Sequence, residues 1–374
     1  KKLIFKYGLL ITLILVLVFS FSGCFGGGAR SIGWSGISFT GDSLYLGSMD
    51  GKIVSLTIEN GRGGSPISLD EQASNGGGCM AAAAAIGIYG TPVIVDGIMY
   101  IGGAGLGSDT GRLYLFDTSK GEVVDRLPRG EEVGPVIGGP VVADGVVYFA
   151  SVDGNVYAFN TANGSEIWRF KTEGKIWSTP ILYQDTLIVG SFDKKLYAIN
   201  IADGSQKWSY EAGGPIASKA LIFEDTVYFG SFDRNFYAVN FNDGSFKWQF
   251  AAQSWFWAAP LVYNGEIYAP CLDKNVYVLD TEQGTEIEKY ELSGQLVSSP
   301  VLVDNMIVVA TKEGKLHIIN GDGRDIRLLT DLALSVSAPL SAYEGIIFVH
   351  TQENETIYAL DPETREVVWS YTLQ

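Results

Sequence analysis

The sequence predicts an all-β protein, an eight-bladed β-propeller of four-stranded antiparallel blades, on three observations. One short phrase recurs eight times between Ile53 and Tyr358, and five consecutive copies are spaced 40 residues apart. Within each copy, short runs rich in β-branched and aromatic residues are separated by turn signals, which indicates four strands. No helical periodicity follows residue 24. A repeat of this size is typical of propeller blades, which bury their apolar faces against their neighbours.

Two repeated positions place the blades along the chain. The third strand of the blades contains, in order, Ile53, Leu113, Tyr157, Tyr197, Tyr237, Tyr277, His317 and Tyr358. The start of each blade from the second onward is marked by Pro92, Pro140, Pro180, Ala220, Pro260, Pro300 and Pro339. Proline suits the first residue of a strand, because the backbone N–H that it lacks is not needed there for hydrogen bonds between strands. Both series give the same blade count.

A tryptophan in the fourth strand indicates the kind of propeller. The motif recurs from Ala158 to Trp168, Ala198 to Trp208, Ala238 to Trp248 and, more loosely, Ala359 to Trp369. It resembles the tryptophan-docking motif of pyrroloquinoline-quinone-like (quinoprotein-type) propellers, a family that includes quinoprotein alcohol dehydrogenases and BamB-type outer-membrane assembly lipoproteins. The resemblance covers about residues 31 to 374 and implies that these tryptophans pack between adjacent blades. The fifth, sixth and seventh blades are expected to dock through aliphatic side chains instead.

The first 30 residues predict export. Lysines at the start, an apolar run from Leu9 to Phe19 and small residues before Cys24 are typical of a secretory signal peptide over residues 1–23. Cys24 resembles the acylated cysteine of a bacterial lipobox, which implies a lipid anchor followed by a Gly-rich tether over residues 24–30. The propeller is expected over residues 31–374, with an inserted Gly- and Ala-rich loop at about 70–90. The alternative is an uncleaved membrane anchor.

Both interpretations of this segment place the propeller outside the cytoplasm, because the lysines stay on the inner side. The location is then the periplasmic side of the outer membrane, or the outer face of the plasma membrane in a single-membrane host. A formal net charge of −16 excludes nucleic acid as a partner. With 47% hydrophobic residues the chain has enough apolar content for a folded core, and we expect a monomeric propeller.

Catalytic and metal-binding side chains are few, and the sequence predicts neither a catalytic residue nor a metal site. The two histidines, His317 and His350, lack the spacing of metal ligands. Four aspartates recur at 40-residue intervals, and a ring of carboxylates would bind a cation. Each lies in the same hairpin, however, where aspartate ordinarily caps the turn; these are Asp153, Asp193, Asp233 and Asp273.

The family resemblance raises the possibility of a redox enzyme. It implies, for the dehydrogenase branch, a disulfide between adjacent cysteines above the cofactor, and Glu, Asn and Asp side chains that hold calcium. No two cysteines are adjacent here, and the long insertions of that branch are missing. We therefore expect no enzyme activity and no cofactor, with pyrroloquinoline quinone and calcium as the alternative.

Two blades carry a tryptophan just before their first strand, at a position where the repeat motif does not need one. Trp177 and Trp257 share one repeat position, with Ala217 between them, and Trp255 lies beside Trp257. The segment entering the innermost strand lies at one mouth of the central channel, so these side chains are candidate binding residues for a protein segment. A flat cofactor or a sugar would also stack on them. The other interpretation is that they plug the channel.

These observations favour a non-catalytic scaffold of the cell envelope that resembles the BamB-type proteins and presents its loops to partner proteins. The resemblance implies the barrel-assembly machinery as partner, and the lipid anchor implies contact with a membrane. Two alternatives stay open at this point: a ligand-binding or quinone-dependent redox propeller that uses the tryptophan-lined mouth, and a propeller that binds cell-wall material or sugar.

Overall fold

The computed structural model describes residues 34–69, 86–105, 109–130 and 132–373. Within these ranges, 33 strands form eight sheets. The predicted signal peptide, Cys24, the tether and residues 70–85 of the predicted inserted loop lie outside the described residues. In the part of the chain that is described, no helix has the length and apolar character needed to cross a membrane.

The strands follow one another in blades along the chain. The first four blades comprise β1 (Ser38–Thr40), β2 (Ser43–Gly47), β3 (Lys52–Thr57) and β4 (Ile67–Ser68); β5 (Ile86–Ile88), β6 (Val93–Val95), β7 (Ile98–Gly105), β8 (Gly111–Asp117) and β9 (Glu122–Leu127); β10 (Val141–Ala143), β11 (Val146–Ala150), β12 (Asn155–Asn160) and β13 (Glu166–Lys171); and β14 (Ile181–Tyr183), β15 (Thr186–Gly190), β16 (Lys195–Asn200) and β17 (Gln206–Glu211).

The last four blades keep the same pattern. They comprise β18 (Leu221–Phe223), β19 (Thr226–Gly230), β20 (Asn235–Asn240) and β21 (Phe246–Ala251); β22 (Leu261–Tyr263), β23 (Glu266–Pro270), β24 (Asn275–Asp280) and β25 (Glu286–Glu291); β26 (Val301–Val303), β27 (Met306–Ala310), β28 (Lys315–Asn320) and β29 (Ile326–Asp331); and β30 (Ser341–Tyr343), β31 (Ile346–His350), β32 (Thr356–Leu360) and β33 (Val367–Thr372).

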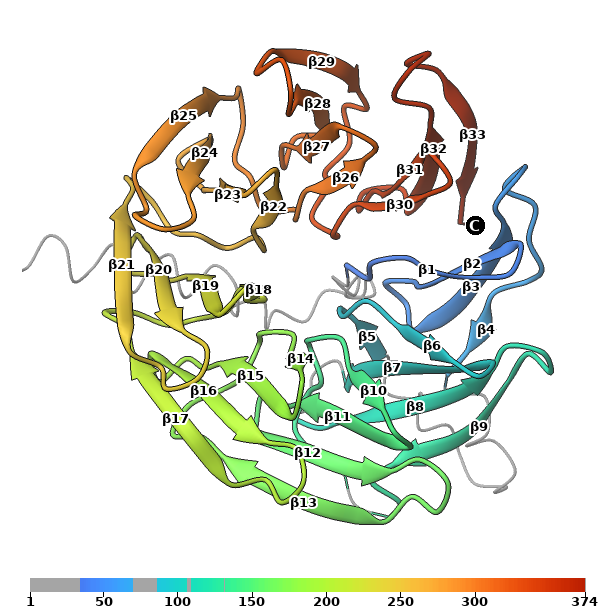
Figure 1. Cartoon of the computed structure of the whole chain (residues 1–374). Helices are drawn as coiled ribbons and strands as arrows, with labels where there is room; N and C mark the ends of the chain where they lie inside the picture. The colour runs from blue at the N-terminus through green and yellow to red at the C-terminus, as the bar shows by residue number, and fades with distance from the viewer. Residues whose placement is uncertain (1–33, 70–85, 106–108, 131, 374) are drawn as a thin grey trace, which may run out of the picture. The chain divides into compact units, whose positions relative to one another are not determined.

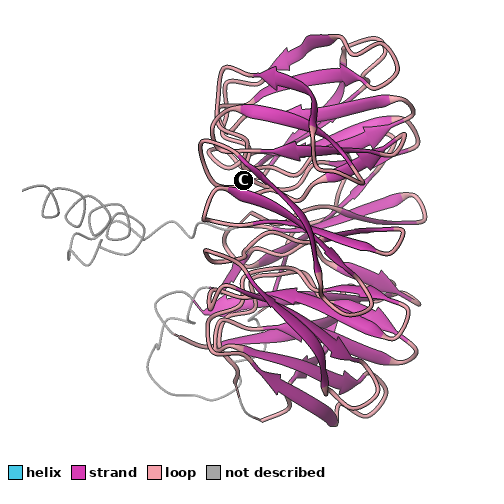
Figure 2. Cartoon of the chain, turned by 60° about the vertical axis from the view of Figure 1, so that its left-hand side comes forward, coloured by secondary structure: helices cyan, strands magenta, loops and turns pink. Residues whose placement is uncertain are grey.

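The eight sheets are arranged radially around a common centre, with the first strand of each blade innermost (Figure 1). Seen from another side, every blade is a twisted sheet of strands joined by short loops (Figure 2). The predicted fold class, an eight-bladed all-β propeller with four-stranded antiparallel blades, is confirmed.

The middle strands of each blade carry the core because both of their faces are covered. In the fourth blade, all five residues of β15 and the four central residues of β16 are buried. The outer strand β17 buries Trp208 and exposes the residues on either side of it. This is the pattern of sheets that stack face to face, in which an outer edge strand meets solvent on one side.

The second blade departs from the common plan. Its strand β7 has eight residues, and β6 pairs with only the first half of it, through Val95 and Ile98. The second half pairs with β5, through Ile88 and Gly103. Residues 86–88 were predicted to belong to an inserted loop, but they form a strand. This strand pairs with the backbone N–H and C=O groups of β7 that β6 does not reach.

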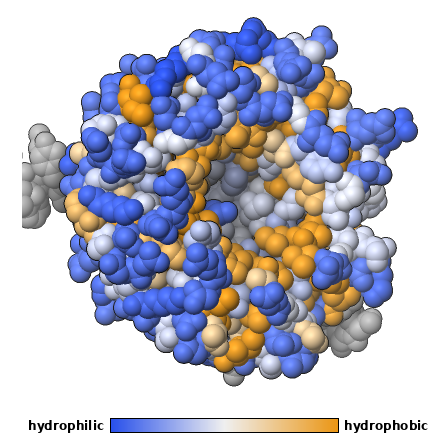
Figure 3. Space-filling view, viewed as in Figure 1, coloured by the Kyte–Doolittle hydropathy of each residue, from blue (hydrophilic) through white to orange (hydrophobic). Residues whose placement is uncertain are grey.

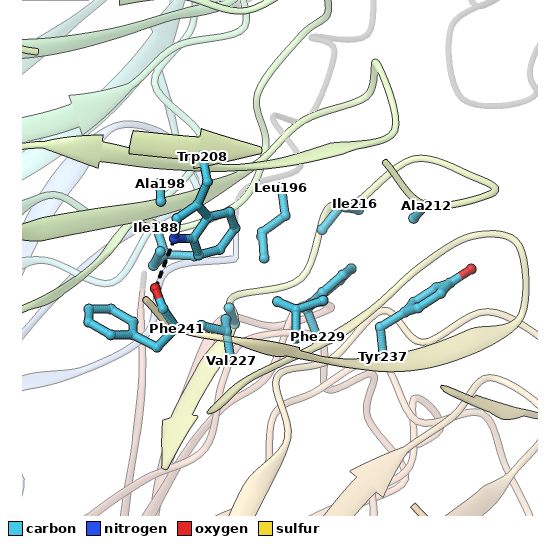
Figure 4. Packing of buried hydrophobic residues seen from close by; sticks show 12 residues of the cluster. Ile188, Leu196, Ala198, Trp208, Ala212, Ile216, Val227, Phe229, Tyr237 and Phe241 are labelled. Carbon is cyan, nitrogen blue, oxygen red and sulfur yellow. Dashed lines mark hydrogen bonds between the residues drawn. The ribbon is translucent and has the colours of Figure 1, made fainter. Parts of the chain in front are cut away.

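Four outer-strand tryptophans contact the following blade in the same way. The indole Nε1 of Trp168 donates to the Ile201 carbonyl at 2.8 Å, and that of Trp208 donates to Phe241 at 2.8 Å (Figure 4). Trp248 donates to Thr281 at 3.0 Å and Trp369 to Ile58 at 2.7 Å. A small residue opposite each ring leaves room for it; these are Ala158, Ala198, Ala238 and Ala359.

The expectation that the fifth to seventh blades lack this tryptophan is wrong for the fifth, because Trp248 lies on β21. In the sixth blade the equivalent position opposite Val278 is Glu288, and Tyr290 is buried two residues later. The sixth and seventh blades meet through Tyr268, Tyr290 and aliphatic side chains. The cluster between the seventh and eighth blades is aliphatic, with Val308, Leu316 and Ile318 among its members.

The ring closes without a strand shared between its two ends. The first blade uses only N-terminal residues and the last only C-terminal ones, and the two lie side by side (Figure 1). Leu44 and Leu46 of the first blade pack with Phe348 and Ile357 of the last. Across the same seam, the hydroxyl of Ser341 donates to the Ile37 carbonyl at 3.2 Å.

Candidate binding site

A cavity of about 650 Å³ lies where the segments that enter the blades line the central channel. Figure 3 shows a hollow at the centre of the ring with hydrophobic residues gathered around it. The volume falls within the range of small-molecule sites. All eight blades contribute residues to its lining.

Most of the entering segments alternate between buried and channel-facing residues, as extended chain does. In the fifth blade Ile216 and Ser218 are buried, whereas Ala217 and Lys219 are not. The same alternation around the ring produces two layers of side chains. We call the first layer tier one: Trp34, Tyr89, Ile137, Trp177, Ala217, Trp257, Val297 and Ser337. We call the second layer tier two: Thr91, Gly139, Thr179, Lys219, Ala259, Ser299 and Pro339.

Tier one is aromatic on two sides of the ring. Trp177 and Trp257 come from the fourth and sixth blades, and their ring centroids are 6.2 Å apart in an edge-to-face arrangement. They meet because the blade between them carries the small Ala217 at this position. Trp34 and Tyr89, from the first two blades, pack edge to face at 4.8 Å.

The third predicted binding tryptophan lies outside the channel lining. Trp255 is 42% exposed and stacks on Phe232 at 4.7 Å, with the two rings 8° from parallel. Phe232 also stacks on Trp257 at 5.6 Å. Phe192 extends the cluster from Phe232 to Trp177. The rim residue Trp255 is thus joined by aromatic packing to the two tryptophans that face the channel.

Tier two carries one charged side chain among the described lining residues, that of Lys219. The Lys219 side chain is exposed to the channel, and the protein around it removes enough water for burial to lower its pKa below the usual value. No described acidic side chain forms an ion pair with it. An amine without a partner acid favours a ligand that supplies negative charge.

The hydroxyl groups of tier two are set up as donors. Thr179 Oγ1 accepts a hydrogen bond from the Gly139 amide at 3.1 Å, and Ser299 Oγ accepts one from the Ala259 amide at 3.0 Å. Because the backbone amides occupy acceptor sites on these oxygens, each hydroxyl proton can point to another acceptor. The described lining also contains the indole N–H of Trp177, a buried donor without an acceptor among the described residues.

The sequence analysis did not identify Trp34, Tyr89 or Lys219 as candidates. Trp34 and Trp177 are each followed by a serine whose side chain points into the blade. The hydroxyl oxygen of Ser35 accepts a hydrogen bond from the Gly47 amide at 3.1 Å. That of Ser178 accepts one from the Gly190 amide at 3.0 Å. The Trp-Ser dipeptide shared by the two blades would have identified Trp34 as a residue at the same repeat position as Trp177. For Lys219 no repeat signal exists, since neighbouring blades carry threonine, alanine or serine at that position.

The four recurring aspartates have local partners. Asp153 accepts from Tyr157 OH at 2.8 Å and from the Asn155 amide at 2.8 Å. Burial raises the pKa of Asp153, but these bonds and one from Gly134 outweigh it and hold that pKa below its usual value. The tyrosine bond recurs at Asp193, Asp233 and Asp273. These carboxylates therefore fix their own hairpins.

The two histidines lie in packed positions. His350 is buried, its Nδ1 lies 3.1 Å from the Ser35 carbonyl across the ring seam, and burial lowers its pKa. Burial likewise lowers the pKa of His317. Within the described ranges, no group of three or more His, Cys, Asp or Glu side chains is placed to hold a metal ion.

The fit of the channel to pyrroloquinoline quinone with calcium can be judged from its donors. Calcium takes oxygen ligands, above all carboxylates. The described lining carries an amine and contains no Asp or Glu. In the same part of the chain Cys271 is a free, buried thiol, and burial raises its pKa to about 12. The described residues of the channel do not fit a calcium-bound quinone.

Comparison with known proteins identifies similar chains. A family model described as outer membrane protein assembly factor BamB matches residues 109–221, 213–287 and 272–374, which together exceed half of the chain. A curated outer membrane protein assembly factor BamB from Xanthomonas campestris pv. campestris is 30% identical over 102 residues, which cover 25% of this chain and 24% of that protein. The aligned part thus spans about a quarter of the curated relative.

Two solved structures share the fold. The crystal structure of BamB from Moraxella catarrhalis superposes with a TM-score of 0.67 at 14% identity, over 85% of this chain and 91% of that one. The crystal structure of the computationally designed Ika8 protein superposes with a TM-score of 0.70 at 15% identity, over 89% of this chain and 96% of that one. The resemblance inferred from the tryptophan motif is confirmed.

Proposed function

The chain belongs to the propeller family described as outer membrane protein assembly factor BamB, and from this premise we propose that it is a non-catalytic scaffold of the cell envelope. Its task is to hold a partner protein of an outer-membrane assembly machinery. The family match over residues 109–374 is the observation that carries this proposal.

The structure supports a scaffold through its rigidity. Adjacent blades are locked by buried clusters and by the four tryptophan bonds, so the loops are presented from a fixed frame. The rim aromatic group of Trp255, Phe232 and Trp257 combines an exposed ring with a packed base. Aromatic residues supported in this way dominate the binding energy of protein interfaces. We place the partner contact there.

Replacing Trp255 with alanine is expected to weaken partner binding at least tenfold, because the exposed ring supplies the anchor. The measurement is photo-crosslinking in intact host cells, with the crosslinker at Gln253 and mass spectrometry of the captured proteins. A barrel-assembly protein should be recovered in quantity, and much less of it after Trp255→Ala.

Phe246→Ala is the matched control, since this exposed aromatic side chain lies on the outer strand β21, away from the rim. It should leave capture unchanged. Recovery of no assembly protein by the abundant parent protein, or equal recovery after Trp255→Ala, would refute the proposed contact.

The proposed site of action is the periplasmic side of the outer membrane, with a lipid on Cys24 as the anchor. Support comes from the sequence that precedes Cys24, which resembles a lipoprotein signal peptide. Cys24→Ser is expected to abolish incorporation of an alkyne-labelled fatty acid and to release the propeller from the membrane fraction. Cys271→Ser should retain the label. Labelling that persists in Cys24→Ser would exclude the anchor.

A further inference from the structure

The channel combines one cationic group with hydroxyl groups that are free to donate. Tier two offers the Lys219 amine and the hydroxyls of Thr179 and Ser299, whose oxygens already accept backbone hydrogen bonds. No described lining residue carries a carboxylate. A cavity with an unpaired amine and free hydroxyl protons suits an anionic acceptor.

The apolar part of the channel lies at a fixed distance from these donors. Ala217 and Lys219 face the channel from one extended segment, two residues apart, which separates the tiers by roughly 7 Å. Tier one brings three tryptophans and one tyrosine to that level. A ligand with an anionic head and a flat apolar body about one tier away meets both requirements.

We propose that the central channel binds a small aromatic carboxylate, with the carboxylate on Lys219 and the aromatic ring against Trp177 and Trp257. Trp257 belongs both to this site and to the rim aromatic group, but Trp255, the residue that tests the partner contact, does not line the cavity. The cavity of about 650 Å³ has the volume of a small-molecule site.

Other ligand classes fit this lining less well. A cation would meet the Lys219 charge with no acid to offset it. A neutral sugar would leave the Lys219 charge without a counter-charge, and the described lining has no carboxylate to accept protons from sugar hydroxyls. The chain as a whole is acidic, with a formal net charge of −16, so the attraction for an anion is confined to the surroundings of Lys219.

Binding should depend on pH through Lys219. The carboxylate needs the protonated amine, and burial places the pKa of this amine below its usual value in the free protein. Affinity is therefore expected to be greatest below that lowered pKa and to fall as pH rises through it. The decline should begin at a lower pH than for an ordinary lysine.

The test uses the purified full chain and two matched probes, 2-naphthoate and the neutral 2-naphthalenemethanol, measured by titration calorimetry and by quenching of tryptophan fluorescence. The protein should bind 2-naphthoate at least tenfold more tightly than the alcohol. Lys219→Gln should remove this preference, because it should weaken the binding of naphthoate at least tenfold and leave the binding of the alcohol unchanged. Lys219→Arg should retain most of the preference.

Further variants separate the two tiers. Trp257→Ala should weaken both probes to a similar degree, because it removes ring contacts and leaves the amine. Lys289→Gln is the control, an exposed lysine on the outer strand β25. Thermal melts of all variants check that the fold is retained.

Three results would overturn the proposal. The first is that the parent protein does not bind 2-naphthoate at millimolar concentration. The second is that it binds the acid and the alcohol with equal affinity. The third is that Lys219→Gln leaves the affinity for naphthoate unchanged. None of these results bears on the rim contact, which is tested separately by Trp255→Ala.

Discussion

Replacing Trp208 with alanine is expected to lower the free energy of unfolding by about 3–5 kcal/mol. The side chain is 7% exposed and packs in a cluster that joins the fourth and fifth blades, beside Ile188, Val227 and Phe241 (Figure 4). The substitution removes this packing and also the Nε1 bond to the Phe241 carbonyl. Equilibrium unfolding in urea, followed by circular dichroism, measures the loss.

Trp255→Ala provides the matched comparison for the same change of side chain. Its ring is 42% exposed and has no counterpart in the neighbouring blades, so we expect a loss of at most about 1 kcal/mol. Equal losses in the two variants would mean that blade docking does not depend on the buried indole. A large loss for Trp255→Ala alone would show that the rim cluster is structural.

The repeat explains why most of the fold could be predicted. Trp168, Trp208 and Trp248 recur with their flanking residues at intervals of 40, and each makes the same bond to the next blade. A contact that a repeat makes with its neighbour leaves the same residues in every copy, so the sequence records it several times. The strand bounds of the third to seventh blades follow that period for the same reason, and in the eighth blade the last strand, β33, is displaced by one residue.

The departures lie where the period fails. β5 pairs with β7 only because β7 is longer than its equivalents, and Ile86 to Ile88 carry no turn or strand phrase shared with other blades. The motif predicted that Trp369 packs against an adjacent blade, and it does so through Ile58. This partner lies at the other end of the chain, so the 40-residue period does not identify it.

Of the candidate site, only the tryptophans that recur at one repeat position were predicted from the sequence. Trp177 and Trp257 stand out because two blades share one position, and the structure brings them within 6.2 Å of each other. Lys219 is distinctive for the opposite reason, as a charged residue at a position that is neutral in the other blades. The lowering of its pKa by burial depends on the lining from the whole ring and cannot be read from its own segment.

Replacing Gly284 with alanine is expected to destabilise the protein by about 2–4 kcal/mol, because two penalties add. Its φ of +69° lies in the left-handed region that alanine disfavours. A Cβ at this position would also lie 2.3 Å from Cε3 of Trp248. The ring cannot move away freely, since its Nε1 donates to the Thr281 carbonyl at 3.0 Å and its side chain is buried.

Two further variants separate the penalties. Gly265→Ala has the same backbone cost, with a φ of +74°, but nothing lies within 4 Å of its new Cβ, so about 1 kcal/mol is expected. In a Trp248→Ala background the clash at residue 284 disappears, and Gly284→Ala should then cost as little as Gly265→Ala. The coupling in this double-mutant cycle, about 1–3 kcal/mol, measures how tightly the indole is held against the turn of the next blade. Additive effects of the two substitutions would mean that the ring and the turn are not in rigid contact, and the blades would then be held by their apolar clusters alone.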